Sequence, residues 1–510
     1  MEDNSQIKNN YKKIYTNRNK ECFIEREKYI LNLNYVSKNE DKTFRCKFYN
    51  DSSIRCPGFV KINKNEEIVD YNTKHSCIYD EKAIKTLEIK NEVKNKMNII
   101  GNIFNVKAKT IYDQSIKKIT KRKSDNLPEE EEDNNAVQKN IVPSYNSIKP
   151  SIYRLINKNI PHDVENLSEL PNDSPYYFTE RGDKFMAYKT EKIVLLISKF
   201  QAQLIYSNND HMFIDGTFYS SPKSAYQILS VRIHDIKTNN FYTVANAILV
   251  DKEMSTNIEV LMNLNEIIYN NRENKRIIEV FNPRTIHCDF ELGIIGALKQ
   301  VWPNSEIKLC LWHMFRNIEL KRKKLFGDYS NHSIESYNII KRIKTLVYID
   351  PNYIKDVFNL ISEDSENLGE KENNFVNNYF KKTYIEKFNI IEWNYYKVFD
   401  HRTNNACESY NHILNSKFNK KPSIWKLFAE LINDENLLYI KIDNIKKNIG
   451  FDKQKKRGIK SFKDVAIPYY NKYDEEIKKI SDSNAPNKRE KIINVWYQAC
   501  LEFPLYDEDL

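Results

Sequence analysis

The sequence lacks long apolar runs. Its longest apolar stretches, such as "KIVLLISKF" from Lys192, are far too short to cross a bilayer, which takes about 20 apolar residues. The first residues, "MEDNSQIKNNYKK", are polar and contain no apolar segment typical of a secretory signal. We therefore expect neither a membrane partner nor secretion.

Cysteine is too sparse for a disulfide framework. Eight cysteines are spread over 510 residues without a set of close pairs. In an intracellular protein such cysteines are more often metal ligands or core residues than disulfides. We therefore expect a reducing compartment, the cytoplasm or the nucleus.

Glycine is scarce as well, with only 10 residues, while Lys, Asn, Ile and Tyr are abundant. An AT-rich genome produces the same bias, so any single lysine cluster is weak evidence. The charge balance is nevertheless basic, with 80 Lys and Arg against 70 Asp and Glu. A positive excess mildly favours binding to a polyanion, in this case nucleic acid.

The segment from Cys46 to Cys77 carries four candidate ligands for one metal ion. Cys46, Cys56, His75 and Cys77 are spaced as C-x9-C-x18-H-x-C. Residues two apart in a strand point to the same face, so His75 and Cys77 can reach one ion, and a hairpin can bring the other two cysteines together. Sulfur and nitrogen ligands without a carboxylate favour a closed, structural Zn²⁺ site. Four unrelated side chains in a small β domain are the alternative.

This segment resembles the FLYWCH and WRKY-like zinc fingers, which are compact β-sheets with C…C…H-x-H or C…C…H-x-C ligands. "FRC" ending at Cys46 and "CPGF" starting at Cys56 stand where that family has its aromatic-x-Cys and Cys-Pro-Ala-Arg runs. The resemblance implies DNA binding through an exposed sheet face. The residues that we expect to meet phosphates are Lys42, Arg45, Lys47, Arg55 and Lys61, although a solvated face explains each one about as well.

Three acidic residues stand out in the central region. "HMFIDGTFYSS" places Asp215 at the end of an apolar, strand-like run, and "RTIHCDFELGIIGAL" places Asp289 at the end of another. "HRTNNACESYNHILNSKF" places Glu408 near the start of an amphipathic helix. A turn, a cap or a surface position explains each acid singly, and Asp-Gly is a common turn pair. On the helix we expect an inward face formed by Cys407, Tyr410, Ile413 and Leu414.

Taken together, the three acids predict a metal site. From about residue 185 to 320, strands alternate with helices, which is typical of an α/β layer, and open α/β sheets form their sites at the carboxyl ends of strands. Carboxylate oxygens select hard cations such as Mg²⁺ or Mn²⁺. Two such ions about 3.5–4 Å apart can activate an attacking oxygen and stabilise a leaving oxygen in an in-line displacement. We expect Asp215, Asp289 and Glu408 to hold two ions.

The central region resembles the transposase domain of Mutator-like elements (MULE). The blocks "FIDGTF", "HCDFE" with the following "AL", "CLWH" and "TNNACESYN" occur in the family's order over about residues 185 to 415. The resemblance implies an RNase H-like α/β core of DDE type, interrupted by helices between its second and third acids. By position, Asp215, Asp289 and Glu408 become the catalytic triad. Cys310 and His313 become the family's Cys-x-x-His pair, either accessory metal ligands or residues with a packing and hydrogen-bonding role.

The expected domains follow from this resemblance. They are a zinc finger at 20–80, a helical DNA-binding module and linker at 81–184, the first part of the RNase H-like core at 185–327, a helical insertion at 328–400, the last core helix at 401–420 and a C-terminal helical region at 421–510. "VPSYNSIKPSIYRLINKNIP" is interpreted as the linker.

The expected function is a nuclear DNA transposase that cleaves transposon ends and joins them to target DNA. We expect it to bind the terminal repeats and to assemble as a homo-oligomer on DNA. One alternative is a domesticated, non-catalytic DNA-binding protein such as a transcription regulator. A second is an RNase H-like nuclease that acts on RNA or RNA–DNA hybrids, although that reading leaves the finger and the insertion unexplained.

Overall fold

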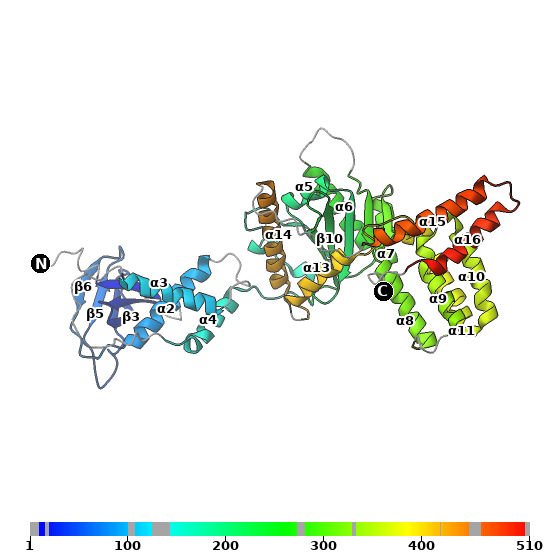
Figure 1. The fold of residues 1–510 in the computed structure, drawn as a ribbon. Coiled ribbons are helices and arrows are strands. Elements are labelled where there is room, and N and C mark those ends of the chain that lie inside the picture. Colours follow the sequence, from blue (N-terminus) through cyan, green and yellow to red (C-terminus); the bar gives the residue numbers. More distant parts are fainter. Residues whose placement is uncertain are drawn as a thin grey trace. The chain divides into compact units, whose positions relative to one another are not determined.

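The computed structural model describes residues 10–15, 20–99, 108–124, 143–272, 281–328, 333–418, 420–447 and 461–504. Contacts divide the chain into two compact units, Met1–His162 and Asp163–Leu510, and each is described by itself (Figure 1). None of the helices in the described ranges combines the length and the apolar character that a membrane span requires.

The N-terminal unit begins with an antiparallel sheet in which each strand pairs with the next. Its strands are β1 (Tyr11–Tyr15), β2 (Glu21–Glu25), β3 (Tyr29–Val36), β4 (Lys42–Cys46), β5 (Phe59–Ile62) and β6 (Ile68–Asn72). Alternation along the strands buries one face, as in β4, where Phe44 and Cys46 are buried and Arg45 is partly exposed. Because β1 pairs with β2, the sheet starts at Tyr11, ahead of the expected boundary at residue 20.

Three helices complete this unit. They are α2 (Glu81–Ile99), α3 (Ala108–Ser124) and α4 (Tyr145–Asn159), and they share a small apolar core that includes Val93, Ile111 and Ile148. The segment interpreted as a linker is therefore mostly helix α4, because its apolar residues recur at helical spacing and pack against α2 and α3. Lys12 of β1 forms an ion pair with Glu88 of α2 at 2.6 Å, which ties the helices to the sheet.

The second unit is built on a mixed sheet with the strand order β13-β12-β9-β10-β11-β8-β7. The strands are β7 (Met186–Lys189), β8 (Ile193–Leu196), β9 (His211–Thr217), β10 (Gln227–Asp235), β11 (Asn240–Leu249), β12 (Thr285–Cys288) and β13 (Glu306–Leu309). β12 runs parallel to both β9 and β13, and the other neighbours are antiparallel. An α/β core with a separate N-terminal antiparallel sheet confirms the coarse fold expected from the sequence.

The helices of this part of the unit are α5 (Lys199–Ser207), α6 (Met254–Asn270), α7 (Leu292–Val301), α8 (Leu311–Phe326), α13 (Asn405–Ser416) and α14 (Ile424–Lys446). α5, α6, α13 and α14 contact strands of the sheet, and α7 packs on α6. The side chains of β9 alternate between two environments. Met212 and Ile214 join the core that contains residues of α6 and α7. The side chain of Asp215 instead points toward α13 and accepts a hydrogen bond from a side chain of that helix. The sheet thus buries an apolar face and presents Asp215 on the other.

A helical body follows between the second and third acids. Its elements are α9 (Ile334–Thr345), the short helices η5 (Leu346–Tyr348) and η6 (Pro351–Tyr353), α10 (Ile354–Leu368), α11 (Glu370–Asn373), the π-helix η7 (Asn374–Ile385) and α12 (Ile390–Trp393). The C-terminal helices α15 (Phe462–Asp482) and α16 (Lys488–Glu502) pack with it, and Figure 1 shows α9, α10 and α16 together. Tyr348 stacks on Phe503 at 4.2 Å, so the chain's last helices complete the core of the insertion.

The segment before β7 belongs to the second unit, because it packs against α14. It contains the short helices η2 (Leu167–Glu169) and η3 (Pro175–Tyr177), and the rings of Tyr176 and Tyr177 contact Trp425. Arg181 donates to the buried carboxylate of Glu435 at 2.6 Å. Residues 163–184 therefore join the α/β unit, whereas the sequence grouped them with the preceding helices.

Candidate active site and candidate metal centre

Asp215 lies inside a strand. β9 continues through Asp215 and Gly216 to Thr217, so this Asp-Gly pair forms no turn. Asp215 faces Ser230 across the antiparallel β9–β10 pair, and its Oδ1 accepts a hydrogen bond from the backbone N–H of Gly216 at 2.8 Å. The turn interpretation, which was the ordinary explanation for this dipeptide, does not apply.

Asp289 lies beside Asp215. The parallel register pairs Met212 with Ile286 and Phe213 with His287, and continuing it by two residues brings Asp289 level with Asp215. Neighbouring strands are about 4.7–4.9 Å apart. Asp289 follows the last residue of β12 and precedes α7, so both carboxylates occupy the same edge of the sheet.

Helix α13 brings Glu408 to the same place. Asn404, just before the helix, donates from Nδ2 to the backbone oxygen of Ile214 at 3.2 Å. One turn after Glu408, Asn411 donates from Nδ2 to Oδ2 of Asp215 at 2.7 Å. The first turn of α13 is thus fixed to the strand that carries the first acid.

The inward face of α13 differs from the expected one at one position. Cys407, Tyr410 and Leu414 are buried as expected, but Ile413 is exposed. Asn411 takes the buried position instead, because residues at i, i+3, i+4 and i+7 share a helix face. An amide in an apolar stripe gives no periodic signal, so the sequence reasoning missed it.

His313 lies between two of the acids. Its Nδ1 is 2.9 Å from Oδ1 of Asp289 and 3.8 Å from Oε1 of Glu408. Burial acts to lower its pKa, but the neighbouring Asp289 and Cys310 raise that pKa to about 10. Without an ion in the cluster, these neighbours favour the protonated imidazole.

The predicted Cys-x-x-His pair is part of the same cluster. Ligand atoms of Asp289, Cys310 and His313 all lie within 4.8 Å of one another, so these three side chains could hold a metal ion. Cys310 precedes α8 and is buried, and its sulfur accepts a hydrogen bond from the backbone N–H of Asn404 at 3.2 Å.

The electrostatics of the cluster suit a cation. Burial and the nearby Asp289 raise the pKa of Asp215 to about 8, and burial also raises the pKa of Glu408. Among the described residues, Asp289 Oδ1, Glu408 Oε1 and His313 Nδ1 are buried atoms without a hydrogen bond of acceptable geometry, although they lie close together. A divalent ion would satisfy the two carboxylate oxygens and favour the ionised form of all three acids.

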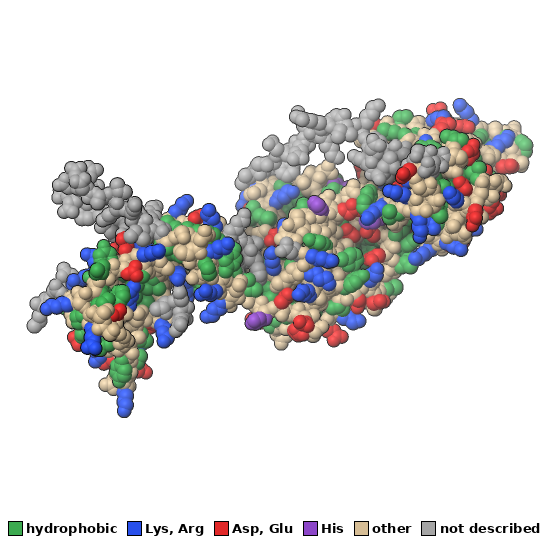
Figure 2. Space-filling view, turned by 90° about the horizontal axis from the view of Figure 1, so that it is seen from below, with side chains coloured by type: hydrophobic (Ala, Val, Ile, Leu, Met, Phe, Trp, Pro, Cys, Tyr) green, Lys and Arg blue, Asp and Glu red, His purple; other side chains and the backbone are tan. Residues whose placement is uncertain are grey.

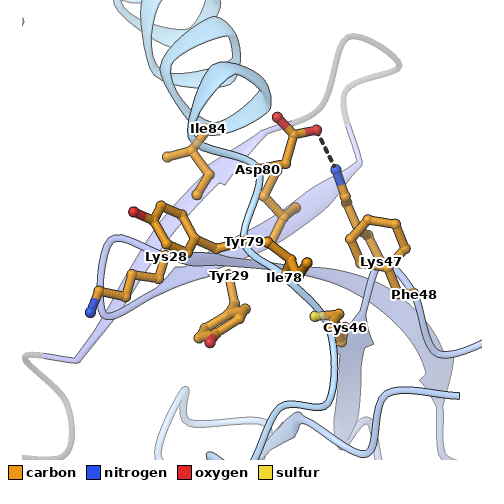
Figure 3. A pocket seen from close by; sticks show the side chains of 11 residues that line it. Lys28, Tyr29, Cys46, Lys47, Phe48, Ile78, Tyr79, Asp80 and Ile84 are labelled. Carbon is orange, nitrogen blue, oxygen red and sulfur yellow. Dashed lines mark hydrogen bonds and ion pairs between the residues drawn. The ribbon is translucent and has the colours of Figure 1, made fainter. Parts of the chain in front are cut away.

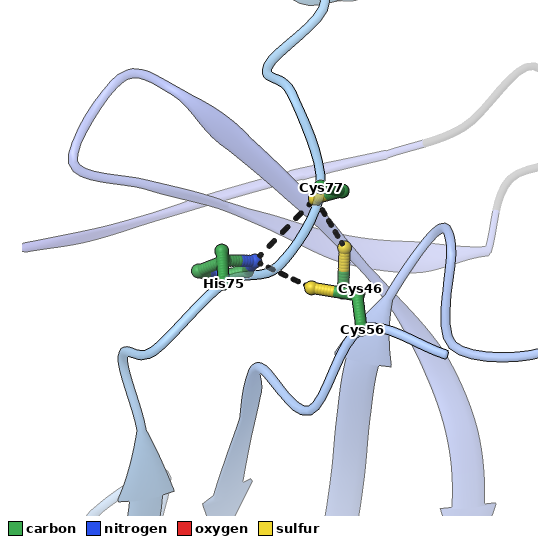
Figure 4. A group of neighbouring side chains, drawn as sticks. All are labelled: Cys46, Cys56, His75 and Cys77. Atoms are coloured by element: carbon green, nitrogen blue, oxygen red, sulfur yellow. Dashed lines mark hydrogen bonds between the residues drawn. The ribbon is translucent and has the colours of Figure 1, made fainter. Parts of the chain in front are cut away.

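The N-terminal unit holds a second candidate metal centre, shown in Figure 4. The sulfurs of Cys46 and Cys77 are 3.6 Å apart, and Nδ1 of His75 is 3.2 Å from the sulfur of Cys56 and 3.8 Å from that of Cys77. With Zn–S and Zn–N bonds of about 2.3 and 2.0 Å, tetrahedral ligands are separated by roughly 3.5–3.8 Å. The four predicted ligands therefore come together at spacings that fit a Zn²⁺ ion.

Three further residues shape this centre, and no sequence pattern pointed to them. Oε2 of Glu25 lies 3.1 Å from Nε2 of His75, on the side of the ring that faces away from the sulfurs. The ring of Tyr29 stacks on the imidazole at 3.6 Å. A Cβ on Gly58 would come within 2.3 Å of the imidazole, so only glycine leaves room for His75 here.

Without a bound ion, the pKa values of these ligands depart from their ordinary ranges. Burial raises the pKa of a thiol, but backbone N–H groups, first that of Gly58, lower the pKa of Cys56 to about 6. Burial acts against the charge of His75, yet Cys46 and Glu25 raise its pKa to about 10. Burial raises the pKa values of Cys46 and Cys77. Zinc binds thiolates and a neutral imidazole, so zinc binding at this centre would release protons from these ligands.

Most of the basic residues expected to meet DNA have protein partners. Lys42 pairs with Glu21 at 2.7 Å, and Lys61 pairs with Asp41 at 3.3 Å. Arg45 lies over the ring of Tyr49, and Arg55 is exposed. On the face drawn in Figure 2, basic and acidic side chains are mixed over both units.

Lys47 lines a small pocket beside the candidate metal centre. Figure 3 shows its ion pair with Asp80, which measures 3.0 Å, above Tyr29 and Cys46. Lys47 thus connects the sheet to the start of α2.

Comparison with known protein families finds a match in the central segment. Residues 211–317 match the family model of the MULE transposase domain. This match contains Asp215, Asp289, Cys310 and His313, and it ends before Glu408. The search of curated proteins found no match for the chain. Residues 211–317 of the α/β unit are therefore similar in sequence to the MULE transposase domain.

Proposed function

We propose that this chain is a DNA transposase that cuts transposon ends and joins them to target DNA. The convergence of Asp215, Asp289 and Glu408 on one sheet edge, within a chain that carries a MULE transposase domain, supports this function. We assign the triad to these three acids. Nothing in this assignment depends on the N-terminal unit.

The strand arrangement supports an RNase H-like core. From β11 to β13 the order is β11-β10-β9-β12-β13, with the first three strands antiparallel and the last two parallel to β9. The helices from α9 to α12 lie in sequence between Asp289 and Glu408, as in the family's interrupted core.

The reaction consists of two in-line displacements without a covalent enzyme intermediate. Water first replaces the 3′ oxygen at a phosphodiester of the transposon end, which frees a 3′-OH. That hydroxyl then replaces a 3′ oxygen in a target strand, so one phosphodiester is lost and another is formed. Two Mg²⁺ or Mn²⁺ ions, when bound, supply the activation of the attacking oxygen and the stabilisation of the leaving oxygen.

The residues of the chain position the reacting groups. Asp215, Asp289 and Glu408 would hold the ions, and Asn411 fixes the orientation of the Asp215 carboxylate. His313 offers a positive charge beside Asp289, where the phosphate of the substrate is expected.

We further propose that the Cys46–Cys77 centre binds Zn²⁺ and that the N-terminal unit, as a FLYWCH- or WRKY-like finger with its helices, binds the terminal repeats. The spacing of the four ligand atoms supports the zinc assignment. Of the proposed phosphate contacts, Arg55 is the most accessible, since Lys42, Lys47 and Lys61 are in ion pairs. We place the protein in the nucleus, as a homo-oligomer on DNA.

A cleavage assay with the element's own ends tests this function. The genomic sequence on both sides of the gene is searched for inverted repeats to serve as the DNA, and the full chain is assayed with Mg²⁺ and with Mn²⁺. Asp215→Asn should abolish cleavage and leave DNA binding intact. Asp210→Asn is the matched control, because Asp210 precedes the same strand and its ion pair with Arg284 is long, at 3.9 Å.

The outcomes separate the candidates. Cleavage that survives in the Asp215→Asn variant contradicts the triad. If the unaltered chain binds the repeats but cuts neither them nor any other DNA, the domesticated DNA-binding protein becomes the better account.

A further inference from the structure

An exposed aromatic cluster lies next to the proposed triad. In the loop between β9 and β10, the side chains of Phe218, Tyr219 and Tyr226 are 46%, 44% and 47% exposed. Phe218 follows Asp215 by three residues, and an extended chain advances at most about 3.6 Å per residue. The backbone that carries this ring is therefore within about 11 Å of Asp215. Clustered apolar side chains on a surface indicate a binding site.

The loop is held in place. The backbone N–H of Tyr226 donates to the oxygen of Leu249 at 2.8 Å, and that of Lys421 donates to the oxygen of Tyr219 at 3.2 Å. Ser220 donates from Oγ to Oδ1 of Asn415 on α13. The loop that carries the three rings is thus tied to β11, to α13 and to the segment that follows α13.

The geometry of the rings suits flat ligands. Phe218 and Tyr226 meet edge to face, with centroids 5.2 Å apart and an interplanar angle of 72°. In such a pair the ring that contributes its edge keeps both faces free of its partner. Lys223 in the same loop and Lys420 and Lys421 nearby are exposed. Aromatic faces beside lysines are the combination that binds unpaired nucleotides, through base stacking and phosphate contacts.

We propose that Phe218, Tyr219 and Tyr226 form a stacking site for a base that leaves the DNA duplex next to the phosphodiester held at the three acids. This inference rests on the proposed transposase function. DNA advances 3.4 Å per base pair, so the distance of about 11 Å between Asp215 and the Phe218 backbone corresponds to roughly three nucleotides. The stacked base would therefore lie within about three nucleotides of that phosphodiester. A base that leaves the duplex loses its stacking partners, and the aromatic faces replace them.

Binding to partly unpaired DNA tests the site. The probes are a 30-base-pair duplex and the same duplex with two unpaired adenines at its centre, one replaced by 2-aminopurine. The full chain should bind the unpaired probe about tenfold more tightly by fluorescence anisotropy, and the 2-aminopurine emission should be quenched on binding. Both probes have the same paired arms, so contacts of the N-terminal unit with paired DNA contribute equally to the two affinities and cancel in their ratio.

Matched variants identify the rings as the cause. Phe218→Ala, Tyr219→Ala and Tyr226→Ala combined should bind both probes equally, whereas Phe218→Trp with Tyr226→Trp should keep the preference. Phe178→Ala, which removes an exposed aromatic side chain elsewhere in the same unit, should also keep it.

Several results would overturn the stacking site. The first is equal binding of the two probes by the unaltered chain. The second is a triple alanine variant that still binds the unpaired probe more tightly. The third is a tryptophan variant that loses this preference as completely as the triple alanine variant. A triple variant that changes from dimer to monomer in light scattering would assign the rings to contact between copies instead. If the unaltered chain cleaves DNA but the triple alanine variant still prefers the unpaired probe, the stacking site is wrong and the transposase function stands. If the unaltered chain prefers the unpaired probe but cleaves no DNA, the transposase function is wrong and the stacking site stands.

Discussion

Asn411 and Asp215 are joined by a hydrogen bond of 2.7 Å from the amide Nδ2 to the carboxylate Oδ2, across 196 residues of sequence. The amide belongs to the helix of the third acid, and the carboxylate belongs to the strand of the first. The second carboxylate oxygen of Asp215, Oδ1, is also fixed, because it accepts a hydrogen bond from the backbone N–H of Gly216. The carboxylate therefore has a defined orientation before any ion binds.

Asn411→Ala should slow Mg²⁺-dependent cleavage by roughly 10- to 100-fold, because a hydrogen bond to a charged group contributes about 1.5–3 kcal/mol. The loss should appear largely as a higher Mg²⁺ concentration for half-maximal rate, which a metal titration of single-turnover cleavage measures. His412→Ala is the control, since His412 is exposed on the same helix. An unchanged metal dependence in Asn411→Ala would show that this bond has no part in positioning Asp215.

Glu25→Gln should weaken zinc binding by about 10- to 100-fold, the usual cost of losing a carboxylate behind a histidine ligand. The carboxylate orients the imidazole and favours donation of its nitrogen electrons at Nδ1. Competition with a fluorescent chelator measures the affinity. Glu27→Gln, an exposed neighbour in the following turn, should bind zinc like the unaltered chain.

Gly58→Ala should displace His75, because the new Cβ would lie 2.3 Å from the imidazole carbon Cε1. Cobalt substitution gives a direct readout, since d–d absorption reports the number and geometry of ligands. We expect the tetrahedral spectrum to weaken or disappear, while Ser52→Ala in the preceding exposed turn keeps it. A full tetrahedral spectrum in Gly58→Ala would mean that His75 is not a ligand.

Local sequence patterns predicted the parts of the sites that depend on residue type. Cys46, Cys56, His75 and Cys77 were found from spacing, and their atoms come together because a hairpin and a short loop close the distance. Glu25 and Tyr29 were missed, because their contacts with His75 form only when β2 and β3 pair beside the ligand loop.

Long-range packing explains most of the remaining differences. Residues 163–184 carry no periodic signal, so their attachment to α14 through Tyr176 and Trp425 was not visible in the sequence. The exposure of Ile413 has the same cause, since it depends on which side of α13 meets β9.

A histidine cluster at the other end of β9 should make the second unit acid-sensitive. Nδ1 of His211 lies 3.1 Å from Nε2 of His287, and the ring of His401 contacts those of His211 and His234. Burial, reinforced by His211 and His234, lowers the pKa of His401 to about 4, and burial also lowers the pKa values of His211 and His287.

These lowered histidine pKa values predict that the second unit loses stability as the pH falls. An unfolded histidine has a pKa near 6.5, so below that pH the unfolded chain binds more protons than the folded unit. Stability is fully present above about pH 6.5 and is lost as the pH falls toward 4. A pKa shift of one unit corresponds to about 1.4 kcal/mol of stability for a fully buried group. His401 is partly exposed, so its contribution to the free energy of unfolding is smaller.

Urea unfolding at pH 7.0, 5.5 and 4.5, followed by tryptophan fluorescence, measures this loss in the second unit, because all five tryptophans lie beyond residue 163. His401→Asn should flatten the decline between pH 6.5 and 4, since asparagine tolerates the positive φ of 55° at this position and carries no charge. His412→Asn, an exposed position, should leave the decline unchanged. A decline equally steep in His401→Asn would assign the acid sensitivity to other groups.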